Sequence, residues 1–105
     1  MSLRGKKLGL LLSTSPGQPA FQHGLCLAEV ALDEGVEVYV YCVDEAVRGV
    51  AEPRLQALAA RGLKLFACAY AAQRRQINLN DQATLAGLAS LSDLMAATDR
   101  FLSFN

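Results

Sequence analysis

The chain has 105 residues, of which 52% are hydrophobic and 19% are charged, so it predicts one domain with its own packed core and excludes a disordered polypeptide. Ten basic residues balance ten acidic ones, and this zero net charge provides no long-range attraction to nucleic acid or to a membrane, neither of which is expected as a direct partner. The longest apolar run, residues 65–72, is far too short to cross a bilayer, and residues 1–7 lack the apolar core of a secretory signal, so we expect a cytoplasmic protein.

The first half of the chain alternates strand-like and helix-like segments. Residues 7–13 form a mostly apolar run that ends at a Ser/Pro/Gly cluster, which is typical of a strand buried on both faces. In residues 20–34, apolar side chains recur at helical spacing and Gly35 follows as a stop signal, which predicts a helix. Residues 36–43 are rich in β-branched and aromatic side chains and predict a second strand.

The middle of the chain repeats this alternation. Residues 44–49 read as a turn region, and Pro53 then opens a second predicted helix that ends at Gly62. Residues 63–67 are apolar enough to predict a third strand of modest length.

The end of the chain completes an α/β pattern. Residues 90–93 have the spacing of a capping box and predict the start of another helix, and residues 100–104 predict a closing strand. This order of elements predicts an α/β fold with three layers, in which a mostly parallel sheet of four to five strands has helices on both faces. We expect residues 1–105 to form one domain, with residues 1–4 as a disordered or cloning-derived start.

Three loops are candidates for a functional site because ligands and reactive groups gather at the carboxyl ends of parallel strands. These loops span residues 14–19, 44–49 and 67–81. The third loop carries Cys68 directly after a buried strand, followed by small residues and a double arginine at positions 74–75.

The surroundings of Cys68 predict a reactive thiol. If a helical turn starts at Ala71, its free N–H groups and the positive end of its dipole point back toward the sulfur, and the arginines add positive charge. Both influences favour thiolate over thiol, and the thiolate is the nucleophile. The alternative is that Cys68 is a packing residue and that Arg74 and Arg75 belong to a solvated polar stretch, since cysteine is among the most frequently buried residue types.

The remaining cysteines and the single histidine give weaker indications of a functional role than Cys68 does. Cys42 lies within an apolar strand and is expected to be a packing residue, whereas Cys26 lies on the polar line of the first helix, partly exposed or at a subunit contact. His23 lies in the first turn of that helix, either as an acid or base near Cys68 or as a surface residue. This inventory does not supply four metal ligands at suitable spacing, so no metal is expected.

One segment resembles the signature of a known family. Residues 68–75, Cys-Ala-Tyr-Ala-Ala-Gln-Arg-Arg, are similar to the motif of the DsrE/DsrF family, which includes the TusD-type sulfur-relay subunits. The resemblance continues through residues 8–13 and the helix after them, residues 86–91 and residues 97–101. Gln76 is a departure, because the family often has glycine there. If that glycine serves a left-handed turn, Gln76 must adopt a strained backbone or the loop must take another course.

The resemblance implies a small DsrE/flavodoxin-like α/β fold, assembly into homo-oligomers (dimer, trimer or hexamer) and a role in sulfur relay, for tRNA thiolation or for sulfur oxidation. It implies that Cys68 carries a persulfide, as a sulfurtransferase without a cofactor, between donor and acceptor proteins. The candidates for supporting the thiolate or for docking a partner are Tyr70, Gln73, Arg74, Arg75 and His23.

Three functional hypotheses therefore stand beside one another. The first is the persulfide carrier. The second is a non-catalytic oligomeric subunit, or a protein that binds a small anion, in which Cys68 is unreactive; the neutral charge and Gln76 favour it. A flavin-binding protein of the flavodoxin type has less support, because the loop of residues 13–19 lacks a dense set of Gly, Ser and Thr donors.

Overall fold

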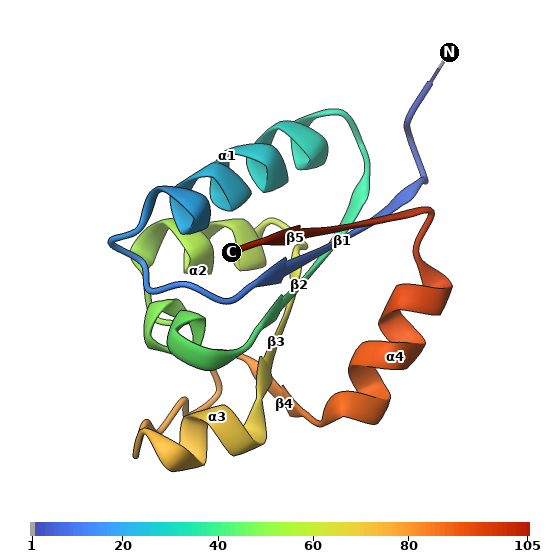
Figure 1. The fold of residues 1–105 in the computed structure, drawn as a ribbon. Helices are drawn as coiled ribbons and strands as arrows, with labels where there is room; N and C mark the ends of the chain where they lie inside the picture. Colours follow the sequence, from blue (N-terminus) through green and yellow to red (C-terminus); the bar gives the residue numbers. More distant parts are fainter. Residues whose placement is uncertain (1) are drawn as a thin grey trace.

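Five parallel strands form one sheet in the computed structural model, which describes residues 2–105 (Figure 1). Met1, the first residue of the predicted disordered start, lies outside the described residues. The strands pair in the order β4-β3-β2-β1-β5. In chain order they are β1 (Lys7–Leu12), β2 (Glu37–Cys42), β3 (Lys64–Cys68), β4 (Thr84–Ala86) and β5 (Arg100–Phe104).

Helices cover both faces of this sheet, as predicted. Figure 1 shows α1, α2 and α3 on one side of the sheet and α4 on the other, which is the arrangement that right-handed crossovers between parallel strands produce. The helices are α1 (Pro19–Asp33), the 3-10 helix η1 (Asp44–Gly49), α2 (Pro53–Ala60), α3 (Ala69–Arg74) and α4 (Leu88–Ala97). The predicted α/β class and parallel sheet are confirmed.

The core lies between the sheet and the helices on one of its faces, and α1 contributes the longest buried stripe. Phe21, Leu25 and Ala28, spaced along one stripe of α1, are fully or almost fully buried, and they cover the buried Leu10 and Val40 of the sheet. This is the stripe that the helical spacing of apolar residues predicts. Gly49 of η1 packs so closely on this layer that a Cβ atom there would collide with the ring of Phe21.

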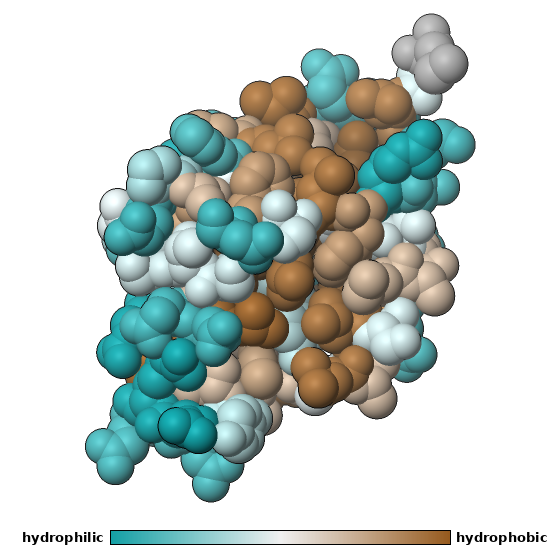
Figure 2. All heavy atoms as spheres, viewed as in Figure 1, coloured by the Kyte–Doolittle hydropathy of each residue, from teal (hydrophilic) through white to brown (hydrophobic). Residues whose placement is uncertain are grey.

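The opposite face of the sheet is covered more thinly. None of the residues of α4 is buried, although Leu91 and Leu94 pack against the core, and a cavity of about 230 Å³ lies between part of this helix and the sheet. Figure 2 shows hydrophobic side chains gathered in a band over β5 and between α1 and α4. In the described part of the chain, every helix is too short or too polar to cross a lipid bilayer.

Several element boundaries differ from the predictions. The capping-box prediction for residues 90–93 is wrong: α4 begins at Leu88 with Gly87 as its N-cap, and the Leu91 N–H already donates to the Gly87 carbonyl at 3.2 Å. The predicted turn of residues 44–49 is a 3-10 helix, and the short strand β4 has no counterpart among the predicted elements.

Candidate functional site

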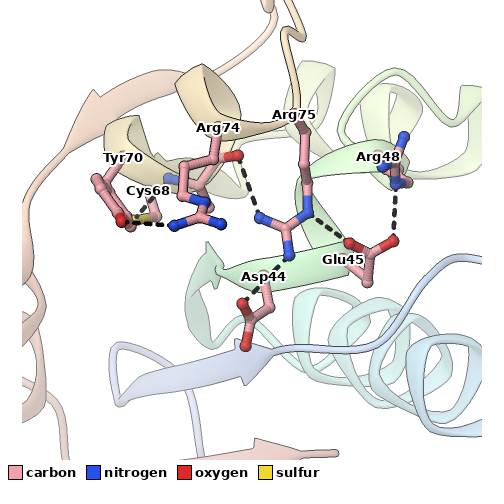
Figure 3. Close-up of polar contacts among 8 residues, drawn as sticks. Asp44, Glu45, Arg48, Cys68, Tyr70, Arg74 and Arg75 are labelled. Atoms are coloured by element: carbon pink, nitrogen blue, oxygen red, sulfur yellow. Dashed lines mark hydrogen bonds and ion pairs between the residues drawn. The ribbon is translucent and has the colours of Figure 1, made fainter.

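Cys68 stands at a junction that contains no loop, because it ends β3 and is also the N-cap of α3. Its sulfur accepts a hydrogen bond from the backbone N–H of Ala71 at 3.4 Å (Figure 3). The helix thus begins at Ala69, two residues before the predicted position, and one of its free N–H groups points at the sulfur. Such a donor favours negative charge on the atom that accepts it.

The Cys68 side chain lines a cavity of about 490 Å³ at the carboxyl edge of the sheet. The residue as a whole is 9% exposed, so its thiol is reached through this cavity and does not project from the surface. Apolar side chains from β1 and α4 form one wall, and polar side chains from α3 form another. The cavity is lined by Leu11, Val43, Asp44, Cys68, Tyr70, Ala71, Arg74, Arg75, Leu88 and Leu91.

The two arginines of the motif have different surroundings. Arg75 donates from Nε to Glu45 at 2.5 Å and from Nη2 to Asp44 at 3.3 Å, and its Nη1 donates to the Ala71 carbonyl at 3.3 Å. The hydrogen bond from Arg75, together with that from Arg48, holds the pKa of the Glu45 carboxyl below its usual value. Arg75 therefore links α3 to η1, and two carboxylates balance its charge.

Arg74 is turned toward the cysteine side of α3 (Figure 3). Its Nη1 donates to the Tyr70 hydroxyl at 3.1 Å, and its guanidinium carbon lies 5.8 Å from the centre of the Tyr70 ring. No ion pair joins Arg74 to a carboxylate among residues 2–105. In Figure 3, Cys68 appears between Tyr70 and the guanidinium of Arg74, and all three line the same cavity. The motif thus provides one unbalanced positive charge beside the thiol.

A buried tyrosine that sequence reasoning did not single out also reaches this site. Tyr41 of β2 is paired with Phe66, and its hydroxyl donates to the carbonyl oxygens of Ala86 at 3.1 Å and Gly87 at 3.2 Å. Because Ala86 is the β4 partner of Cys68, the phenol crosses β3 beside the thiol. Burial, and then the neighbouring Cys68 sulfur, raise the pKa of Tyr41 to about 12.

The structure does not bring every predicted site residue to the cavity. His23 is an exposed residue of α1 and Gln73 an exposed residue of α3, and neither belongs to the cavity lining. Cys42 is fully buried, as predicted, and this burial raises its pKa to about 12. Cys26 is exposed, and its sulfur accepts a hydrogen bond from Arg54 at 3.3 Å. Within residues 2–105, no group of three His, Cys, Asp or Glu side chains is placed to hold a metal ion.

Gln76 occupies the left-handed position that the sequence comparison with the family motif anticipates. Its φ is 55°, directly after Arg75, the C-cap of α3. The N–H of Gln76 donates to the Gln73 carbonyl at 3.1 Å, and the N–H of Ile77 donates to the Ala72 carbonyl at 3.0 Å. These two bonds define a Schellman motif, whose left-handed residue is usually glycine.

Comparison with known proteins agrees with this description. A model of the DsrE/DsrF-like family matches residues 6–104. Among solved structures, the YchN protein of E. coli is similar, with a TM-score of 0.78 and 16% sequence identity, and the alignment covers 95% of this chain and 99% of that chain. A search of the curated proteins finds no match. At this low identity, the likeness to YchN supports the fold.

Proposed function

Because the chain belongs to the DsrE/DsrF-like family, whose members act in sulfur relay, we propose that it is a sulfur-trafficking protein that carries a persulfide on Cys68. The observation that carries this proposal is the position of Cys68 within the family motif. Its sulfur accepts the Ala71 N–H, and it lines an open cavity that also holds the unbalanced charge of Arg74. Together these features place a thiol that a small group can approach beside a hydrogen-bond donor and a positive charge.

The proposed transfer requires two exchanges at the same sulfur. The Cys68 thiolate attacks the outer sulfur of a donor persulfide; a bond forms between Cys68 Sγ and that sulfur, and the donor's own S–S bond breaks. The electron pair leaves with the donor, which becomes a thiolate. An acceptor thiolate then attacks the outer sulfur and releases Cys68 as a thiolate. No oxidant, reductant or cofactor is consumed.

The residues around the cavity have separate parts in this proposal. The Ala71 N–H stabilises negative charge on the sulfur before and after each transfer. Exposed side chains at the cavity, Tyr70 at 64% and Leu88 at 73%, offer donor and acceptor proteins an apolar contact beside the thiol. The proposal also includes a cytoplasmic location and assembly into a homo-oligomer.

The test is sulfur loading followed by intact-mass measurement. Incubation of the reduced protein with a persulfidated donor is expected to add about 32 Da, the mass of one sulfur atom, at Cys68. Cys68→Ser is expected to abolish this gain, whereas Cys26→Ser, which removes an exposed cysteine away from the cavity, is expected to retain it. Loading of Cys68→Ser to the same extent as the parent protein would refute the assignment.

A second candidate function is a non-catalytic subunit in which Cys68 is a packing residue. The observation that favours it is the low exposure of Cys68, 9%, together with the complete pairing of Arg75. Thiol labelling of the native protein distinguishes the two functions. If Cys68 reacts at neutral pH only as fast as the buried Cys42, the second function is supported; if it reacts much faster than Cys42, the carrier is supported.

A further inference from the structure

The charge balance at the cavity indicates what kind of molecule it receives. Among residues 2–105, Arg75 forms ion pairs with Asp44 and Glu45 at the edge of the cavity. Arg74 has no such partner; its guanidinium donates to the uncharged hydroxyl of Tyr70. An arginine that lines the same cavity as a nucleophilic sulfur, and whose charge no carboxylate of the described residues pairs, is suited to bind an oxyanion.

The volume and the lining of the cavity support a small ligand. A space of about 490 Å³ lies within the range of small-molecule sites. Asp44 also lines the cavity, but its carboxylate is already bonded to Arg75 at 3.3 Å. The Tyr70 hydroxyl accepts a hydrogen bond from Arg74, which leaves its own proton for an incoming oxygen atom.

From this geometry we infer that the cavity accepts a small sulfane-sulfur donor that bears an anionic oxygen group, a sulfonate or a carboxylate. Arg74 binds the oxyanion while the Cys68 thiolate attacks the outer sulfur. The inference rests on the proposed function of Cys68 and specifies the substrate class that loads it.

The transfer from such a donor balances without a further reactant. With thiosulfate, a bond forms between Cys68 Sγ and the outer sulfur, the S–S bond of thiosulfate breaks, and sulfite leaves with the electron pair. With a carboxylate-bearing hydropersulfide, the departing group is the corresponding thiolate. In both cases the leaving molecule is an anion with an oxyanion group, so the guanidinium of Arg74 stabilises it as its charge changes.

The experiment compares three donors on the reduced full-length protein: thiosulfate, the hydropersulfide of mercaptopropionate, and the uncharged hydropersulfide of its methyl ester. The initial rate of sulfur addition to Cys68 is measured by mass spectrometry. We expect at least one charged donor to load the parent protein faster than the ester. Arg74→Gln should slow that charged donor by about tenfold, the size of one charge-assisted hydrogen bond, and leave the ester unaffected.

Arg61→Gln is the matched control, because it removes the same charge from an exposed arginine that pairs with Asp33, away from the cavity. It should leave all three rates unchanged. Which charged donor responds to Arg74→Gln identifies the ligand as a sulfonate or a carboxylate.

Two outcomes overturn this inference but leave the proposed function of Cys68 standing. One is that the ester loads Cys68 as fast as both charged donors; the other is that Arg74→Gln slows all three donors equally. If no donor, including a persulfidated protein, loads Cys68, the proposed function fails as well. Circular dichroism of Arg74→Gln verifies that a lost rate does not come from an unfolded variant.

Discussion

The left-handed backbone at Gln76 leads to a quantitative prediction about stability. Gln76 has a φ of 55° and closes α3 through the two hydrogen bonds of a Schellman motif. In this conformation the Cβ of any residue except glycine lies too close to the following carbonyl oxygen. We therefore expect Gln76→Gly to increase the free energy of unfolding.

Two opposing contributions set the size of this effect. Relief of the left-handed strain contributes about 1–2 kcal/mol, and the greater freedom of glycine in the unfolded chain offsets about 0.5–1 kcal/mol of it. The Gln76 side chain is exposed, so its removal sacrifices little buried surface. The two ranges leave a net stabilisation of up to about 1.5 kcal/mol with a central value of about 0.75 kcal/mol, which corresponds to a rise in Tm of roughly 3–6 °C for a domain of this size.

Denaturant unfolding of the two proteins, followed by circular dichroism, measures this difference. The matched control is Gln73→Gly, an exposed position in the regular part of α3, where glycine is expected to cost about 1 kcal/mol. Glycine should thus stabilise the protein at one position and destabilise it three residues earlier. A Gln76→Gly protein that is no more stable than the parent, with Gln73→Gly destabilised as expected, would refute the reasoning.

Two further predictions concern the core. Burial raises the pKa of Tyr41 from 10.0 to about 12 and the pKa of Cys42 from 9.0 to about 12, so the unfolded state releases these protons at lower pH than the folded state. The free energy of unfolding should therefore fall as the pH rises from about 9 to about 12. Denaturant titration at each pH should show a shallower fall in Tyr41→Phe than in the parent protein. An unchanged alkaline slope in Tyr41→Phe would contradict the assignment of a buried, neutral phenol. Gly49→Ala should lower the free energy of unfolding by about 1–3 kcal/mol, because the new methyl group collides with the buried Phe21 ring. Gly17→Ala, where no atom lies within 4 Å of the new carbon, is the control, and equal stability of the two variants would contradict the packing described for η1.

The parts of the fold that depend on local periodicity were predictable from the sequence. The apolar stripe of Phe21, Leu25 and Ala28 predicted the buried face of α1, and the β-branched and aromatic side chains of residues 36–43 predicted β2. Cys68 was expected directly after the third strand, and it is the last residue of β3. The start of α4 was not predictable from Ser90, because the extended backbone of Gly87 begins the helix earlier without a side-chain cap.

The parts of the site that depend on tertiary contacts were not predictable. Arg74 and Arg75 are neighbours in sequence, yet only Arg75 meets Asp44 and Glu45, some thirty positions away, because η1 packs against α3. Tyr41 looked like an ordinary strand residue, and its contact with the β4–α4 turn beside Cys68 depends on a strand that local patterns did not indicate. Strand alternation is the signal that the sequence offers for it, since Tyr41 lies on the opposite face of β2 from Val40 and Cys42.

The absence of a loop between β3 and α3 has a kinetic consequence for the proposed relay. Cys68 pairs with Ala86 in the sheet and caps the next helix, so its backbone is anchored on both sides and the cargo atom moves only by rotation of one short side chain. A carrier of this kind has no swinging arm. Donor and acceptor must bind at the same site in turn, and the donor must dissociate before the acceptor binds. Steady-state turnover should therefore follow a ping-pong scheme in which donor and acceptor compete for that site.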